Sequence, residues 1–266
     1  MPTDPTARFS NRVDDYVRYR PSYPAGVLEI LRAEAGLTPG SIIADIGSGT
    51  GISADLFLRN GNTVYGVEPN DPMRHAAERL LSGYPAFHSV NGRAEATTLP
   101  DGSIDLAIAA QAFHWFDVPK ARAEWRRILR PDGWAVLVWN TRRTETSPFL
   151  RAFEALLQRF GTDYRDVVHT NISAASLEAF YGGAHYIKRT LDHHQELDRN
   201  GIRGRLLSSS YAPAAGHPNH EPMLAELERI VTEHGRDGWV TVEYETEVYV
   251  GRPRTVTSDQ GPGGAG

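Results

Sequence analysis

A short apolar run that ends in an acidic residue and three alternating glycines constrains this chain more than any other segment. Residues 42–46 contain Asp45, and Gly47, Gly49 and Gly51 follow them. An apolar run of this length bounded by glycine predicts a buried strand. Glycine permits backbone conformations and close approaches that side chains would block. A strand that leads through such a turn into a helix is typical of sites for nucleotide-like ligands.

The next predicted strand also ends in an acidic residue. Residues 52–60 have the apolar spacing of a helix, Gly61 stops it, and residues 63–67 form a strand that ends at Glu68. Doubly wound folds hold a ribose at this position, where a carboxylate accepts hydrogen bonds from its hydroxyls. We therefore expect a ligand whose ribose carries no phosphate.

The spacing of the glycines separates two cofactor classes. Dinucleotide folds use G-x-G-x-x-G, whereas this chain has G-x-G-x-G behind Asp45. This pattern resembles the first motif of the class I S-adenosylmethionine-dependent methyltransferases. Three later segments extend the resemblance over roughly residues 41–141: a loop at 92–100 similar to the family's adenine-binding loop, a fourth strand at 103–108, and a turn at 129–134 into the fifth strand.

The resemblance implies an α/β fold with a Rossmann-like seven-stranded methyltransferase sheet. The sheet is expected to be mostly parallel with an antiparallel last strand, and helices are expected on both faces. Strands that alternate with helices up to Thr141 agree with a parallel sheet. Residues 239–250 alternate between apolar and polar side chains and suit the last strand, with 186–191 as the other late strand.

The region between these parts is mostly helical and too long for simple connections. We expect a helical lid there, with helices at 148–160, 173–181, 197–208 and 221–234. The predicted organisation is an N-terminal cap (1–30), a cofactor-binding core (31–145), a lid or substrate region with one late strand (146–238), the last core strand (239–257) and a disordered tail (258–266).

The resemblance implies that S-adenosylmethionine is the cofactor. The residues expected to contact it are Asp45, Gly47, Ser48, Gly49, Gly51, Glu68, Pro69, Asn70, Arg93, Ala94, Glu95 and Gln111. Arg93 departs from the family, in which an aspartate is common, because an arginine cannot accept a hydrogen bond from the adenine amino group. Glu95 is the alternative partner. The structural alternatives are an ordinary tight turn for the glycines and a helix cap for Asp45.

Residues after the fourth strand and near the N-terminus are candidates for contact with the methyl acceptor. His114 is a candidate general base, because the ordinary pKa of a histidine is near neutral, although it could equally fix its loop. Trp115 is expected to form a hydrophobic wall, and Asp117 to cap the next helix. The other candidates for substrate binding are Tyr16, Tyr19 and Arg20, which could instead belong to an amphipathic helix packed on the domain.

Two polar segments further along the chain are weaker candidates for contact with the acceptor. Arg142 and Arg143 follow the fifth strand and could meet an acidic acceptor, but a solvated basic end is favoured. Residues 208–211 could line the same pocket, although their spacing does not demand it.

The composition of the chain argues against several classes of binding partner. The net charge of -5 argues against a dedicated nucleic-acid binder, and the lack of cysteine excludes disulfides and thiolate metal sites. The adjacent His193 and His194 cannot face the same way on a regular element, so no metal is expected. No apolar run reaches membrane-spanning length. We expect a soluble cytoplasmic protein, and the oligomeric state cannot be read from the sequence.

The function predicted by the resemblance is methyl transfer from S-adenosylmethionine to a small-molecule acceptor, most simply on oxygen. The pattern around Tyr16–Pro21 and Gln111–Phe116 resembles the branch that includes trans-aconitate-type carboxylate methyltransferases, without transferring a substrate. Alternatives are methylation on nitrogen or carbon and a nucleic-acid or protein methyltransferase. More remote are an NAD-dependent oxidoreductase and a non-catalytic module that binds the cofactor.

Overall fold

The computed structural model describes residues 17–164, 173–183 and 185–253. One sheet of seven strands has the order β3-β2-β1-β4-β5-β7-β6. The strands are β1 (Ile42–Ile46), β2 (Thr63–Val67), β3 (Phe87–Val90), β4 (Ile104–Ala110), β5 (Leu129–Arg142), β6 (Tyr186–Asp198) and β7 (Trp239–Gly251). β7 runs antiparallel to β5 and β6, and the other neighbours are parallel. The predicted α/β sheet with an antiparallel last strand is confirmed.

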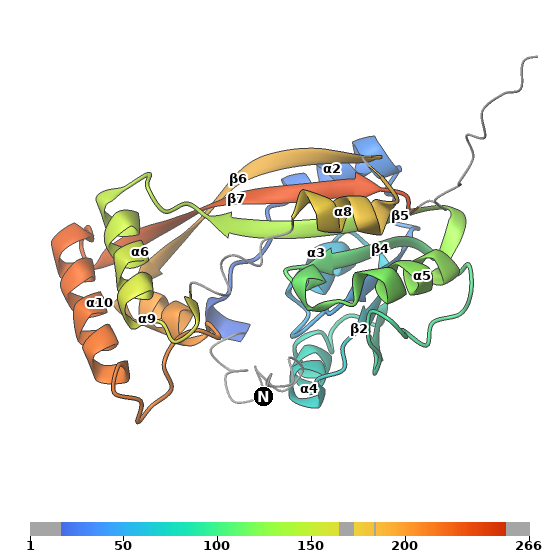
Figure 1. Ribbon diagram of the computed structural model, residues 1–266. Helices are drawn as coiled ribbons and strands as arrows, with labels where there is room; N and C mark the ends of the chain where they lie inside the picture. Colours follow the sequence, from blue (N-terminus) through green and yellow to red (C-terminus); the bar gives the residue numbers. More distant parts are fainter. Residues whose placement is uncertain (1–16, 165–172, 184, 254–266) are drawn as a thin grey trace, which may run out of the picture.

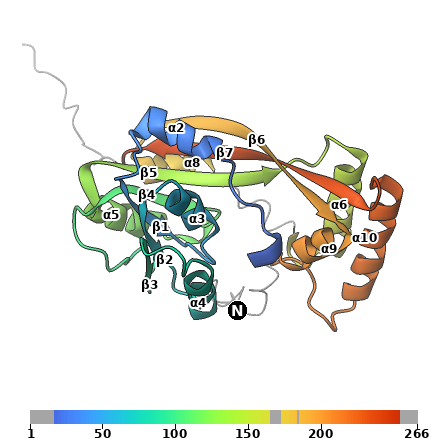
Figure 2. The same ribbon diagram turned by 180° about the vertical axis from the view of Figure 1, so that it is seen from behind.

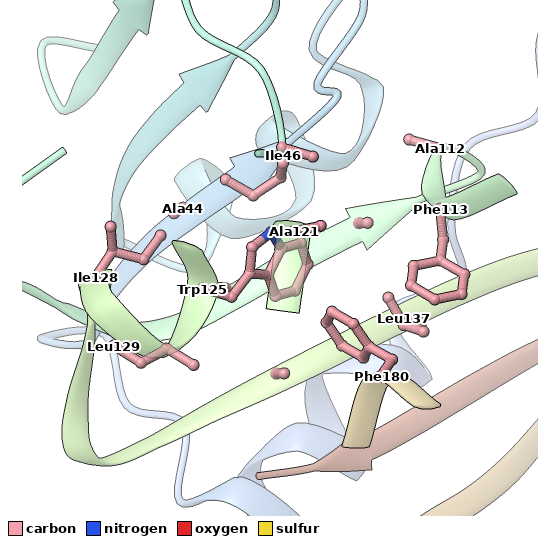
Figure 3. Close-up of a cluster of buried hydrophobic side chains, with 14 of the residues drawn as sticks. Ala44, Ile46, Ala112, Phe113, Ala121, Trp125, Ile128, Leu129, Leu137 and Phe180 are labelled. Carbon is pink, nitrogen blue, oxygen red and sulfur yellow. The ribbon is translucent and has the colours of Figure 1, made fainter. Parts of the chain in front are cut away.

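Helices cover both faces of this sheet (Figure 1). They are α2 (Gly26–Ala35), α3 (Ile52–Arg59), α4 (Asp71–Leu80), α5 (Val118–Ile128), α6 (Pro148–Phe160), α8 (Ala174–Tyr181), α9 (Arg199–Leu207) and α10 (His220–His234). On one face, Trp125 of α5 packs edge-to-face on Phe180 of α8 with ring centroids 5.1 Å apart (Figure 3). On the other face, Leu31 of α2 and Phe57 of α3 are buried in a second cluster.

The central strand β1 carries apolar side chains on both faces of the sheet. Ala44 and Ile46 of β1 belong to the cluster of α5 and α8, whereas Ile43 belongs to the cluster of α2 and α3. Successive side chains of a strand point to opposite faces, so a strand covered on both sides has a continuous apolar run. The acidic Asp45 is the exception in this strand, and it is fully buried.

The long strands β5, β6 and β7 extend beyond the rest of the sheet and carry a separate group of helices. Figures 1 and 2 show α6, α9 and α10 gathered around this extension, opposite α3, α4 and α5. A third hydrophobic cluster joins these helices to β7 through residues such as Phe153, Ile202, Leu227 and Val242. We call α6, α9 and α10 the distal helices.

Two predicted boundaries in this region were wrong. The late strand does not end at residue 191 but continues to Asp198, because it pairs with β7 along its whole length. The helix predicted to start at residue 197 begins at Arg199, and Asp198 caps it by accepting a hydrogen bond from the Gly201 N–H (2.6 Å). The polar side chains of β6 hid the strand, since an edge strand with polar side chains shows no apolar alternation.

Some predictions fall partly or wholly outside the described residues. These are the tail at 258–266 and most of the N-terminal cap, including Tyr16. The turn expected at 129–134 is an irregularity within β5, where the pairing with β4 shifts between Leu129 and Trp134. Asp117 caps α5 as expected, and its side chain accepts a hydrogen bond from the Lys120 N–H at 3.3 Å.

Buried hydrogen bonds between Thr97 and Glu124, which we call the latch, hold the loop after β3 against α5. Glu124 of α5 accepts hydrogen bonds from the Thr97 N–H (2.8 Å) and the Thr97 hydroxyl (2.6 Å). The hydrogen bonds from Arg127 and Thr97 hold the pKa of Glu124 at about 2, so the carboxylate stays ionised. Thr97 itself is fully buried.

We expect the substitution Thr97→Val to lower the free energy of unfolding by about 1–3 kcal/mol, because it leaves a buried carboxylate one donor short. Chemical denaturation measures this value. Thr190→Val, at an exposed position of the edge strand β6, is the matched control and should change stability little. Equal effects of the two substitutions would contradict the latch.

Candidate functional site

A cavity of about 530 Å³ lies at the carboxyl ends of β1, β2 and β4 and reaches the distal helices. Its lining contains most of the residues predicted to bind cofactor or substrate: Arg20, Gly47, Gly49, Glu68, Pro69, Asn70, Arg93, Ala94, Glu95, Gln111, His114 and Trp115. A smaller cavity of about 30 Å³ adjoins it and is lined by Ser48, Ser53 and Gln111 among others. The sheet thus brings together residues that are far apart in the sequence.

The three glycines of the turn are required for two different physical reasons. Gly47, Gly49 and Gly51 all have left-handed backbones, with φ of 71°, 55° and 86°. A Cβ at Gly47 would lie 2.6 Å from the Cβ of Ala112, and one at Gly51 would lie 2.6 Å from Leu81 Cδ1. A Cβ at Gly49 would meet nothing within 4 Å. Gly47 and Gly51 therefore permit tight packing, whereas Gly49 leaves bare backbone beside the cavity.

Glu68 ties the end of β2 to this turn. Its Oε2 accepts a hydrogen bond from the Gly49 N–H (2.9 Å), and its Oε1 accepts one from the Asn70 N–H (2.8 Å). The side chain is almost buried, and this burial raises the pKa of Glu68 above its ordinary value. Each carboxylate oxygen can accept a further hydrogen bond, so Glu68 can hold the turn and still bind a hydroxyl in the cavity.

Asp45 lies behind the turn and lines neither cavity. It is fully buried, and its Oδ2 accepts a hydrogen bond from the Ser53 hydroxyl at 2.7 Å. Burial raises the pKa of Asp45 to about 7, although the bond from Ser53 lowers it. Ser53 reaches the smaller cavity, so Asp45 is connected to that cavity through Ser53.

Gln111 lies at the end of β4 in a left-handed conformation (φ 58°), which is uncommon for a residue other than glycine. Its side-chain amide donates a hydrogen bond to the Asn140 carbonyl oxygen of β5 (3.0 Å). The Asn140 amide in turn donates to the Ser22 carbonyl oxygen (3.1 Å) and accepts from the Thr246 hydroxyl (2.6 Å). This network joins β4, β5, β7 and the N-terminal segment at the junction of the two cavities.

The loop expected to meet adenine forms a tight turn. The backbones of Arg93 and Ala96 exchange hydrogen bonds (3.1 and 3.0 Å), and Ala94 between them is buried. The Glu95 carboxylate accepts a hydrogen bond from the Asp117 N–H (2.8 Å). Glu95 therefore has a structural role at the start of α5 as well as a place in the cavity.

Aromatic side chains form one wall of the cavity. The ring of His114 lies 4.4 Å from the ring of Trp115 and 5.1 Å, edge-to-face, from that of Trp139. All three line the cavity, and the sequence had not singled out Trp139. His114 is thus part of an aromatic wall of the cavity.

The three N-terminal residues predicted to bind substrate lie in different surroundings. Tyr16 lies outside the described residues. Tyr19 does not line the cavity, and its ring packs so closely on Gly204 of α9 that a Cβ there would lie 2.0 Å from it. Arg20 lines both cavities and donates a hydrogen bond to the Ser208 carbonyl oxygen (2.9 Å).

The far end of the cavity was predicted only in part. Ser210 and Tyr211 line it, as the sequence allowed for residues 208–211, whereas the prediction for Arg142 was wrong. Arg142 does not belong to a solvated basic end, because it lines the cavity and donates to the Glu154 carboxylate (2.5 Å) and to the Tyr164 hydroxyl oxygen (2.9 Å). Arg143 does point away from the cavity and pairs with Asp192. The other lining residues here are Thr144, Arg205, Ser210, Tyr211 and Tyr244. For Arg142, the available signal was its position at the carboxyl end of β5.

Two kinds of feature are absent from the described parts of the chain. Within residues 17–164, 173–183 and 185–253, no group of three or more His, Asp or Glu side chains is arranged to hold a metal ion. None of the helices described there is long and apolar enough to cross a membrane.

The strand order and the glycine turn between β1 and α3 match the Rossmann-like fold of the class I methyltransferases. Residues 44–137 match the family described as "Methyltransferase domain". This match assigns the segment from β1 to β5 to a methyltransferase domain.

Individual relatives agree with this assignment. An uncharacterised methyltransferase of Mycobacterium tuberculosis is 34% identical over 165 residues, which cover 62% of this chain and 65% of that protein. The chain thus matches less than two thirds of that relative. The structure of a putative type II methyltransferase from Anaeromyxobacter dehalogenans is 23% identical with a TM-score of 0.63, over 88% of this chain and 98% of the other. A phosphoethanolamine N-methyltransferase of Haemonchus contortus, solved with S-adenosylhomocysteine, shares the fold at 13% identity, with a TM-score of 0.54 over 94% of this chain and 58% of the other.

The buried Asp45 makes a prediction for pH. Its pKa is higher in the folded protein than in the unfolded chain, so its contribution to stability is complete below about pH 4 and is lost as the pH rises through about 7. Asp45→Asn keeps an acceptor for the Ser53 hydroxyl and cannot ionise. We expect the free energy of unfolding of the wild type to fall relative to this variant between pH 5 and 8. Parallel pH profiles from urea titrations would contradict this assignment.

Proposed function

We propose that the protein binds S-adenosylmethionine and transfers its methyl group to an oxygen atom of a small-molecule acceptor. The observation that carries this proposal is the single cavity that runs from the glycine turn, past the aromatic wall, to the distal helices. Such a cavity gives donor and acceptor a common enclosed space, and its size is typical of small-molecule sites.

The residues at the glycine-turn end fit the cofactor. Bare backbone at Gly49 leaves room for a ligand against the turn, and Glu68 offers remaining acceptor positions for the ribose hydroxyls. Ala94 and Glu95 line the same end, where adenine would bind. Ser53 and Gln111, at the smaller cavity, would meet the methionine part.

When bound, S-adenosylmethionine supplies a methyl group that its sulfonium sulfur has already activated. The chain's own residues then have to align the acceptor, exclude water and remove a proton where the acceptor is a weak acid. Trp115 and Trp139 exclude water from the wall, and aromatic faces also favour a nearby cation. We propose His114 as the general base, since it lies in this wall and histidine is the side chain that most often serves in this role.

The remaining functions have weaker support. The proposal of a small acceptor is favoured over a nucleic acid or protein because the lining residues enclose a cavity and the chain is mildly acidic. A nicotinamide cofactor is disfavoured by the spacing of the glycines. Methylation on nitrogen or carbon is the second candidate, and the acceptor assays below distinguish it.

The cofactor part of the proposal predicts a loss of affinity when the carboxylate at β2 is removed. We expect Glu68→Ala to weaken binding of S-adenosylmethionine and S-adenosylhomocysteine at least about tenfold in calorimetric titrations, because the carboxylate that accepts hydrogen bonds from the ligand is lost and the turn loosens. Glu78→Ala, on α4 outside the cavity, should bind as the wild type does. Unchanged affinity in folded Glu68→Ala would count against the placement.

The base assignment predicts a change in the pH profile of methylation. With an acceptor found by screening hydroxyl, carboxyl and amine compounds, His114→Ala should lower kcat about 10²-fold or more and remove the acidic limb of the kcat profile. A variant with reduced kcat but the same pH profile would indicate that His114 only shapes the wall. Turnover of amines alone would place the methyl on nitrogen.

A further inference from the structure

Three arginines from separate segments converge at the distal end of the cavity. Arg20 comes from the N-terminal segment, Arg142 from the end of β5, and Arg205 from α9, and all three line the cavity. Tyr211 lies among them. Burial alone would raise the pKa of Tyr211, yet the nearby guanidinium groups of Arg205 and Arg142, and more weakly that of Arg20, hold it below its ordinary value.

The positive charge there exceeds the negative charge. Among the described residues that line this end, Glu154 is the sole carboxylate, and it accepts hydrogen bonds from Arg142 and from the Tyr164 hydroxyl (2.6 Å). The other two carboxylates of the described lining, Glu68 and Glu95, belong to the glycine-turn end. Three guanidinium groups against one carboxylate leave a net positive charge within an enclosed space.

Arg142 also carries an unused donor. Its Nη2 binds Glu154 and Tyr164, whereas its Nη1 is buried and has no hydrogen-bond partner among the described residues. A buried charged donor without a partner is costly, and a ligand oxygen would satisfy it. The Tyr211 ring is held in place beside Tyr164 (ring centroids 4.9 Å), and its carbonyl oxygen accepts a hydrogen bond from the Thr162 N–H (3.0 Å). The cluster is therefore built before any ligand enters.

We propose that this cluster, Arg20, Arg142, Arg205 and Tyr211, binds an anionic group of the methyl acceptor, a carboxylate or a phosphate. Guanidinium groups bind both through paired, charge-assisted hydrogen bonds, and their strength increases in an enclosed site. This inference rests on the proposed function, because it places the acceptor in the same cavity as the donor. It makes the acceptor a small organic anion and excludes a purely cationic amine.

The test measures anion binding in the presence of the cofactor product. Full-length protein saturated with S-adenosylhomocysteine is titrated calorimetrically, in chloride buffer, with acetate, succinate, citrate and glycerol phosphate as probes. We expect at least one probe to bind, and binding by glycerol phosphate alone would identify a phosphate site. Arg205→Met should weaken that probe at least about tenfold, since charge-assisted hydrogen bonds are lost.

Two further variants make the result specific. Arg142→Lys keeps a cation beside Glu154 but removes the second guanidinium arm, and it should also weaken the probe. Arg143→Met removes the neighbouring arginine, which pairs with Asp192 outside the cavity, and should leave the affinity unchanged. Equal binding by all variants, or no binding of any probe by the wild type, would overturn the inference.

S-adenosylhomocysteine affinity separates this inference from the function on which it rests. Each variant should bind S-adenosylhomocysteine as the wild type does, because Arg142 and Arg205 line the distal end of the cavity and Arg143 lies outside it. If the wild type fails to bind this compound, the donor site itself is wrong. The wild type could also bind S-adenosylhomocysteine but bind no anion probe, or bind the probes as tightly as all the variants do. In that case only the assignment of the acceptor site is wrong.

Discussion

The carboxylate of Glu68 is the group on which the candidate site depends. It accepts hydrogen bonds from the backbone of Gly49 and Asn70, so one side chain fixes both the glycine turn after β1 and the start of α4. The turn itself has three left-handed glycines, and the N–H groups of Gly47 and Ser48 also donate hydrogen bonds to the Val67 carbonyl oxygen at the end of β2. Because Glu68 is nearly buried, its desolvation is tolerated only while these backbone donors are present. The turn and the carboxylate therefore stabilise each other.

The parts of the site that the sequence predicted are those fixed by local pattern. The order strand, glycine turn, helix, strand and carboxylate occupies residues 42–68, and each step depends on neighbours a few residues away. The structure places Gly49 and Glu68 together, as that pattern required. The seven-stranded, mostly parallel sheet followed from the resemblance. The strand β7 was predicted because its buried and half-exposed residues alternate along most of its length.

The parts that the sequence did not predict depend on contacts between distant segments. Arg142 enters the cavity because β5 continues beside β7, where Arg142 pairs with Tyr244, and because α6 brings Glu154 to it. Tyr19 packs on Gly204 across most of the chain length, which no spacing rule could indicate. Gln111 takes a left-handed backbone that its residue type disfavours, and its bond to Asn140 helps to hold it there.

The two ends of the cavity differ in the sign of their net charge. Two carboxylates line the glycine-turn end with Arg93, whereas three arginines line the distal end with the single carboxylate of Glu154. Under the proposed function, the donor is cationic at sulfur and the acceptor is anionic at a group remote from the attacking atom. A reversed acceptor would bring its anionic group toward Glu68 and away from Arg142 and Arg205, so like charges would oppose that pose. The same arrangement that attracts the acceptor would thus also orient it toward the methyl group.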